Sequence, residues 1–319
     1  MLPIEKYICN NFGCEEKLFI SALENSPSSR GYVLGAISEI ILQQHLNSLG
    51  YEVFRIIEKP SGGNNAKNAE ARGDFYVRKK DSNDAEWLVI EVKGLKSNSE
   101  FRGSKFDTPN KVFRYLKPLV FPAADAKKKC YQKGLLTYRK KQKTWEQSHP
   151  HKTFPEFRWS EHRPGPISCN LSGIWDSPES MKKYLENLPK SKYTESSYRD
   201  RTGSIIVLET HKPSTRIAPI TGIKQAAPLV GEFSILAVDL FLRTGKHEFA
   251  FLNPLKISHS PGSPEHLYQN YTIDILIPGI KNVPILEDPW YLDFEKCVSE
   301  SAPIYLPIDL SQIDHRKDL

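Results

Sequence analysis

The chain has 319 residues, of which 39% are hydrophobic, so it can bury a sizeable core and wholesale disorder is excluded. Its longest apolar stretch has 10 residues and contains Asp239, which is well short of the roughly 20 apolar residues of a membrane-spanning helix. The first residues lack the pattern of a secretory signal, and the five cysteines are scattered without a paired metal-binding spacing. We therefore expect a cytoplasmic protein with reduced thiols.

Positive charge is concentrated in one segment. Residues 102–143 hold 13 Lys or Arg against two Asp, a net charge of +11, which leaves −5 for the rest of a chain that carries +6 in total. Such a segment indicates a polyanionic partner, with nucleic acid favoured over a membrane surface. The alternative interpretation is a solvated helix face.

Helical spacing dominates the first 50 residues. A short helical lead is expected over the first 30 residues, and a stronger helix over residues 31–49, where apolar residues recur at helical spacing before Gly50. A strand is expected over residues 51–57, followed over residues 59–73 by a polar loop rich in Gly and Asn.

The rest of the chain alternates between helical, irregular and strand-like sequence. Basic helical sequence runs from Asn110 to Gln147, and a Pro-rich, aromatic stretch from His149 to Ile174 is expected to be irregular. Strands are expected at residues 203–210, 233–244, 247–252 and 271–278, with a hairpin turn at residues 245–246. These elements predict an α/β protein whose mixed central sheet is flanked by helices.

The most informative feature is a predicted hairpin formed by residues 74–79 and 86–94. Because side chains alternate between the faces of a strand, Glu91 and Lys93 share one face, and the register brings Asp74 to the same side. Two carboxylates and an ammonium then converge. The alternative is a hairpin with a charged, solvated face and an ordinary surface pair, but the run WLVIEVKG is more typical of a buried central strand.

A cluster of charges in a sheet is costly unless something compensates it, and a divalent cation would do so. Carboxylate oxygens suit Mg²⁺, which keeps several waters and phosphate oxygens in its shell. A water bound to the ion becomes a better nucleophile, and the ion stabilises charge on the phosphate. Lys93 is placed to orient or deprotonate that water. The implied reaction is phosphodiester hydrolysis with Mg²⁺ as cofactor.

These residues resemble the PD-(D/E)xK nuclease signature that many type II restriction endonucleases carry, because Glu91-Val92-Lys93 follows Asp74 by seventeen residues. The resemblance implies that Asp74 and Glu91 ligate the metal, that the Val92 carbonyl is an extra ligand, and that Lys93 is the catalytic lysine. Glu39, on the preceding helix, matches the family's frequent additional acidic residue, although a solvated helix residue is the alternative interpretation.

The resemblance covers residues 30–96 and departs from the signature at Gly73, which stands where the family often has proline. It implies a restriction-endonuclease-like core with insertions. We expect a single elaborated nuclease domain over residues 1–319, with the active-site core at residues 30–96, a basic and irregular insertion at residues 97–202 and a β-rich part at residues 203–319.

The function implied is a Mg²⁺-dependent, sequence-specific endonuclease of double-stranded DNA in a restriction-modification system. A homodimer is expected because each site cuts one strand, and a companion DNA methyltransferase is the further partner of such a system. Contacts to DNA phosphates are expected from Arg102, Lys105, Lys111, Arg114, Lys127, Lys128 and Lys129. The alternatives are a repair or recombination nuclease of the same fold and a DNA-binding protein that does not cut.

Two further acidic residues, Asp239 and Asp274, lie in apolar strand sequence. They are candidates for extra metal ligands or for buried polar groups with backbone partners. His149, His151 and His162 lack a second pair at zinc spacing and are interpreted as loop residues.

Overall fold

A computed structural model of the chain describes residues 3–57, 73–82, 86–97, 106–160, 162, 171, 173–194, 204–210, 215–268, 271–280 and 286–315. The helices are α1 (Pro3–Phe12), α2 (Glu16–Asn25), α3 (Pro27–Ser48), α5 (Pro109–Val120), α6 (Ala126–Ser148), α7 (Pro178–Asn187), α8 (Ser191–Thr194), α9 (Phe241–Thr244) and α10 (Phe294–Ser301). The strands are β1 (Tyr51–Arg55), β2 (Phe75–Lys79), β3 (Glu86–Ser97), β4 (Ile206–Thr210), β5 (Arg216–Ile217), β6 (Lys224–Gln225), β7 (Ile235–Asp239), β8 (Phe249–Leu252), β9 (Thr272–Leu276), β10 (Trp290–Tyr291) and β11 (Leu306–Pro307).

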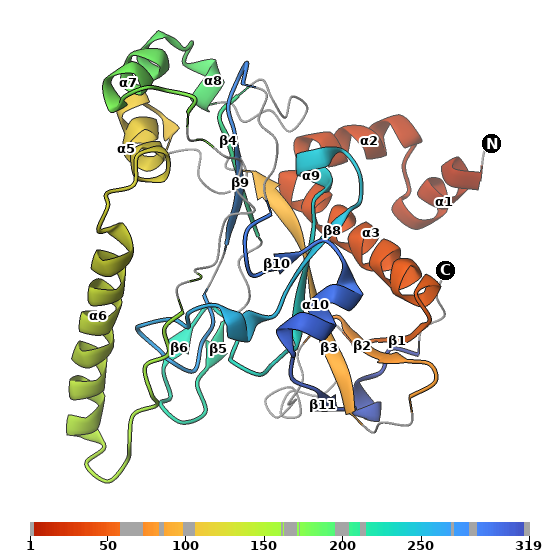
Figure 1. Ribbon diagram of the computed structural model, residues 1–319. Coiled ribbons are helices and arrows are strands. Elements are labelled where there is room, and N and C mark those ends of the chain that lie inside the picture. The colour runs from red at the N-terminus through yellow and green to blue at the C-terminus, as the bar shows by residue number, and fades with distance from the viewer. Residues whose placement is uncertain are drawn as a thin grey trace.

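A mixed sheet of nine strands lies at the centre, flanked by helices (Figure 1), which confirms the predicted fold class at this level. Its main path runs β1-β2-β3-β7-β8-β10. Strand β2 is antiparallel to its neighbours β1 and β3, β7 is parallel to β3, and β8 is antiparallel to β7. The far end of β3 pairs with β4, which in turn pairs with β9. The long strand β3 therefore connects most of the sheet.

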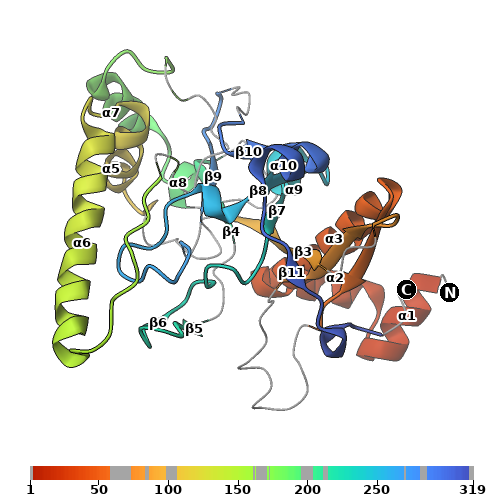
Figure 2. The same ribbon diagram turned by 60° about the horizontal axis from the view of Figure 1, so that its bottom comes forward.

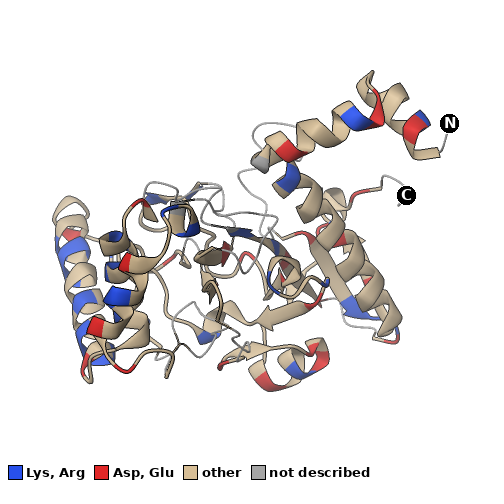
Figure 3. Cartoon of the chain, turned by 90° about the horizontal axis from the view of Figure 1, so that it is seen from above, with Lys and Arg blue, Asp and Glu red and all other residues tan. Residues whose placement is uncertain are grey.

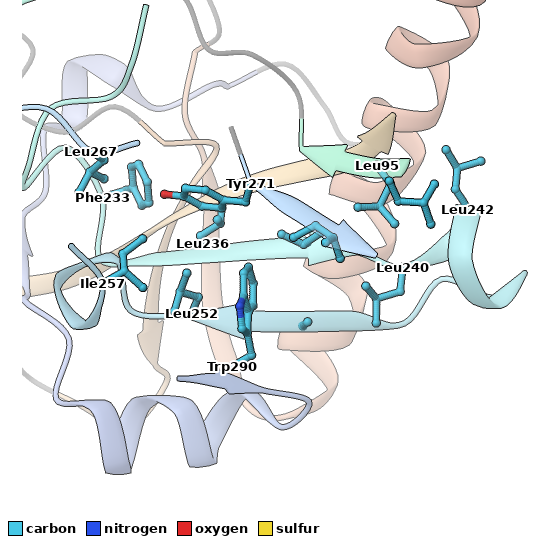
Figure 4. Close-up of a cluster of buried hydrophobic side chains, with 14 of the residues drawn as sticks. Leu95, Phe233, Leu236, Leu240, Leu242, Leu252, Ile257, Leu267, Tyr271 and Trp290 are labelled. Atoms are coloured by element: carbon cyan, nitrogen blue, oxygen red, sulfur yellow. The ribbon is translucent and has the colours of Figure 1, made fainter. Parts of the chain in front are cut away.

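Both faces of β3 are buried, as its apolar run predicts. Leu88, Ile90 and Val92 pack on one face in a cluster that includes Leu42 and Leu46 of α3. The opposite face carries Trp87, Val89 and Leu95, which join a second cluster, and Figure 4 shows Leu95 of this cluster together with Leu236 of β7 and Leu252 of β8. The alternation of side chains expected from the sequence is thus confirmed, with apolar neighbours on both sides.

Three predicted boundaries are wrong for identifiable reasons. The helical lead consists of two helices, and α3 begins at Pro27, where the Ser26 hydroxyl accepts a bond from Ser29 N–H. The single basic helix is divided into α5 and α6, because the residue before Pro122 is disfavoured in a helix. The strand over residues 233–244 ends at Asp239 and continues as the short helix α9.

The two strands β7 and β8 still pair as expected, but the connection between them differs from a tight turn. Helix α9 fills it, and Gly245 ends that helix with a positive φ of 80°. Most of the polar loop predicted at residues 59–73 lies outside the described residues. Residues 149–160 contain neither helix nor strand, as predicted.

Among the described residues, no helix is long and apolar enough to cross a membrane. Among the described residues, Cys9, Cys14 and Cys297 are free thiols, whereas Cys169 lies outside the described residues.

Candidate functional site

Asp74 is held at the point where β2 begins. Its backbone N–H donates to the carbonyl of Ile90 at 2.8 Å, and its carbonyl accepts from Ile56 N–H at 2.9 Å. Its side-chain Oδ2 accepts a bond of 2.6 Å from the Val92 N–H. The carboxylate therefore takes the place of a backbone carbonyl as the acceptor for the Val92 N–H of β3. This bond fixes the carboxylate beside Glu91 and Lys93.

Glu91 and Lys93 form an ion pair on the same face of β3. The ammonium of Lys93 also donates to the carbonyl of Val92 at 3.2 Å. Only 16% of the Glu91 side chain and 20% of the Lys93 side chain are exposed, so this pair is largely removed from solvent. That degree of burial argues against the interpretation as a solvated surface pair.

The charges in this cluster oppose one another. Burial, reinforced by repulsion from Glu91, raises the pKa of Asp74 to about 7, although Lys93, the Val92 N–H and Arg55 act in the opposite direction. Burial alone would lower the pKa of Lys93, but attraction to Glu91 and Asp74 outweighs it and the pKa is raised. The lysine is thus cationic at neutral pH, and one carboxyl group near it is poised between its two forms.

Glu39 reaches this cluster from α3. It forms an ion pair with Arg55 of β1, and its charge contributes to the raised pKa of Lys93. The helix therefore directs Glu39 toward the sheet, which argues against a solvated helix residue. Arg55 was missed by sequence reasoning; a basic residue in the strand predicted at residues 51–57 was the available signal.

Gly73, the residue before Asp74, packs directly against β3. A Cβ atom at this position would lie 2.6 Å from Cγ1 of Val89 and 2.7 Å from the carbonyl oxygen of Ile90. Any larger residue, including proline, would require the strands to move. Glycine therefore allows Asp74 to approach β3 closely.

The oxygen atoms of this site fit a hard cation such as Mg²⁺. The carboxylates of Asp74 and Glu91 and the carbonyl of Val92 are the ligand types it prefers, and it needs only one or two carboxylates from the protein. The Lys93 ammonium already contacts both Glu91 and the Val92 carbonyl, so one positive charge is accommodated between those two groups. The described residues contain no group of three or more His, Cys, Asp or Glu side chains arranged for a metal ion.

The basic residues expected to bind DNA lie elsewhere in the molecule. Lys111 and Arg114 are on α5, and Lys127, Lys128 and Lys129 are exposed on α6. Figures 1 and 2 both place α6 along the edge of the molecule opposite α3, and the blue segments of its ribbon in Figure 3 mark its Lys and Arg residues.

The structure thus does not bring these side chains together with the carboxylates. Arg102 and Lys105 lie outside the described residues. Two of the described lysines also have local partners, because Lys111 pairs with Asp107 and Lys129 pairs with Asp125. These exposed pairs contribute little to stability and leave the ammonium groups accessible to phosphates.

The other acidic candidates are buried and fully engaged. Asp239 accepts bonds from Ser38 Oγ at 2.5 Å and from Phe241 N–H at 2.9 Å, and its Oδ2 lies 2.6 Å from Nδ1 of His247. Asp274 pairs with Arg243. Both residues have the character of buried polar groups with partners.

Comparison with known proteins identifies no relative of this chain. No protein-family model matches the chain, and no curated protein or solved structure shows significant similarity to it. Function must therefore be inferred from the site itself.

Proposed function

We propose that this protein is a Mg²⁺-dependent endonuclease of double-stranded DNA with a PD-(D/E)xK site in a restriction-endonuclease-like core, acting as a type II restriction enzyme. The observation that carries the proposal is the convergence of Asp74, Glu91 and Lys93 where β2 begins beside β3. Two carboxylates and a lysine, mostly buried but not sealed, are what metal-assisted hydrolysis of a phosphodiester needs.

Each residue has a distinct role in this proposal. Asp74, Glu91 and the Val92 carbonyl would hold the ion, which when bound supplies activation of the attacking water and neutralisation of charge on the phosphate. Lys93 orients the water and neutralises charge on the phosphate, since attraction to both carboxylates keeps it cationic. Glu39 is a positioning residue, because it pairs with Arg55 and adds negative charge near Lys93.

A DNA-binding protein that does not cut is the second candidate, and the burial of the cluster weighs against it. Carboxylates repel the phosphate backbone, and a mostly buried ion pair is a poor source of stability compared with apolar residues of similar volume. A site kept for binding alone would have no use for Asp74 and Glu91 at this position. The free-energy cost of burying these two carboxylates is explained if they take part in catalysis.

The exposed lysines of α6 are proposed to bind the phosphate backbone, while base recognition comes from other contacts. The helix region 126–148 carries eight Lys or Arg and one Glu, and its apolar side packs through Tyr138 and Trp145 on an aromatic cluster. The basic side is therefore held toward solvent. A companion methyltransferase acting on the same DNA sequence belongs to this proposal as well.

The proposal is tested by cleavage of supercoiled plasmid and lambda DNA with Mg²⁺, followed by sequencing of the fragment ends. Wild-type protein should produce discrete fragments with one shared end sequence. Asp74→Asn and Lys93→Ala should lose cleavage by several orders of magnitude and still bind DNA, and Ca²⁺ should support binding without turnover.

The matched control is Lys79→Ala, in the same hairpin, which removes an exposed ion pair with Glu295 and should leave cleavage unchanged. Wild-type cleavage in excess EDTA, or full activity of Lys93→Ala, would refute the assignment. Cleavage confined to branched or damaged DNA would identify a repair nuclease instead.

A further inference from the structure

Helix α3 is apolar on two opposite sides. One side packs Leu42 and Leu46 against the sheet, whereas the other presents apolar side chains to solvent. These exposed residues are Tyr32, Val33, Ile37 and Ile40, with 74%, 42%, 38% and 42% of each residue accessible. The only Asp, Glu, Lys or Arg residues of this helix are Arg30 and Glu39. A helix with apolar side chains on two opposite sides is normally covered on both of them.

Helices α1 and α2 extend this exposed surface. They run outward from α3 beyond the sheet, as Figures 1 and 3 show. Helix α2 buries no residue, and α1 buries only Ile8. Isolated ten-residue helices are marginal in water, so such an arm needs a partner to be stable. Its large exposed apolar residues are 47–62% accessible and comprise Ile4, Tyr7, Phe12, Leu18 and Ile20.

We propose that this N-terminal apolar surface, formed by these nine residues of α1, α2 and α3, binds the same surface of a second copy of the chain in a two-fold symmetric dimer. A two-fold interface must be complementary to itself, and an apolar surface meets that condition without any charge matching. Nine side chains, each about half accessible, offer on the order of 800 Å², which is what one partner contributes to an interface of standard size.

The charges around this surface argue against a nucleic acid or an anionic membrane as its partner. Between Tyr32 and Ile40, the exposed side of α3 has no Lys or Arg. A nucleic acid or an anionic membrane would require basic groups there. The arm itself has Glu5, Glu15, Glu16 and Glu24 against only two lysines. A protein surface of the same apolar character is the partner that fits.

The dimer would also place two sites together. Helix α3 carries the apolar surface on one side and Glu39, which pairs with Arg55 near Lys93, on the other. Pairing of two α3 helices therefore links two sites through one rigid element. This consequence rests on the proposed nuclease function, since a double-strand cut needs two sites, but the dimer itself is inferred from the apolar surface alone.

The test measures the oligomeric state of the full chain by sedimentation velocity at micromolar concentration, without DNA. Wild-type protein should be a dimer. Val33→Glu combined with Ile37→Glu should be monomeric, with a dimer Kd raised at least about 30-fold and an unchanged far-ultraviolet circular dichroism spectrum. The matched control is Leu136→Glu on α6, a 66% exposed apolar residue outside the surface, which should leave the dimer intact.

A charge-complementation experiment tests whether the surface meets its own copy. Val33→Lys combined with Ile37→Lys should also be monomeric, and mixing it with the Glu variant should restore a dimer. A monomeric wild type, a dimeric Glu variant or a mixture that stays monomeric would overturn the proposal. Asp74→Asn should remain dimeric, so a dimer found without any nuclease activity would overturn the proposed function and leave the dimer standing.

Discussion

Asp74→Asn should stabilise the metal-free protein at pH 8 while abolishing cleavage. The substitution preserves the size of the side chain and an oxygen that accepts the Val92 N–H, which lies 2.6 Å from Oδ2 in the wild type. It removes the negative charge that burial and Glu91 oppose. A residue kept for stability would show the opposite result, because its loss would weaken the fold.

The magnitude follows from the two states of Asp74. Its pKa rises from an ordinary value of 3.8 to about 7 on folding. A carboxyl group whose pKa is raised contributes stability at pH values below 3.8, and this contribution is lost as the pH rises through about 7. At about 1.4 kcal/mol for each pH unit, the ionised group costs at most about 4 kcal/mol above pH 7. The gain from Asn should therefore grow between pH 4 and pH 7 and then level off.

The assay is urea denaturation in excess EDTA at pH 5 and pH 8, comparing the free energy of unfolding of variant and wild type. The control is Asp293→Asn, because Asp293 caps α10 through the Lys296 N–H at 2.7 Å and Asn caps helices about as well. This control should show no difference between the two pH values. Equal destabilisation by Asp74→Asn at pH 5 and pH 8 would refute the electrostatic description of the site.

Three further outcomes are expected. Gly73→Ala should destabilise the fold by about 1–3 kcal/mol in urea denaturation and reduce cleavage, because its Cβ would lie 2.6 Å from Cγ1 of Val89; a neutral effect would contradict this close approach. Ser38→Ala should cost about 1–3 kcal/mol, since it removes a donor from the buried Asp239 carboxylate, and equal melting temperatures would disprove it. Burial lowers the pKa of His259 to about 4, so stability should fall as the pH drops from 6.5 toward 4. His259→Gln should flatten that part of a plot of unfolding free energy against pH.

The central hairpin could be predicted from the sequence because two strong local signals coincide in it. Alternation of side chains fixes the faces of β3, and the acidic residue at the start of β2 lies within the same local unit. Asp74 and Lys93 are separated by few residues in the chain, so one hairpin register brings them together. Local sequence was sufficient for this part of the candidate site.

The remaining partners depend on contacts between distant segments. Arg55 pairs with Glu39 of α3 and lowers the pKa of Asp74, and the sequence marks only a basic residue in a strand, not these two partners. The boundaries of β7 were missed because Asp239 ends the strand through its bond to the Phe241 N–H. That side-chain bond replaces a hydrogen bond between strands. The spacing of apolar residues does not predict such a bond.

The pairing of β3 also determines when the site can form during synthesis. β3 lies near residue 90, yet its parallel neighbour β7 begins at Ile235 and another of its partners, β11, begins at Leu306. At about 5–20 residues per second, these partners leave the ribosome many seconds after the hairpin does. Contacts between such distant segments also form slowly. The carboxylates therefore remain on an unfinished sheet until both β7 and β11 have been synthesised, and any chemistry at this site should begin only after that.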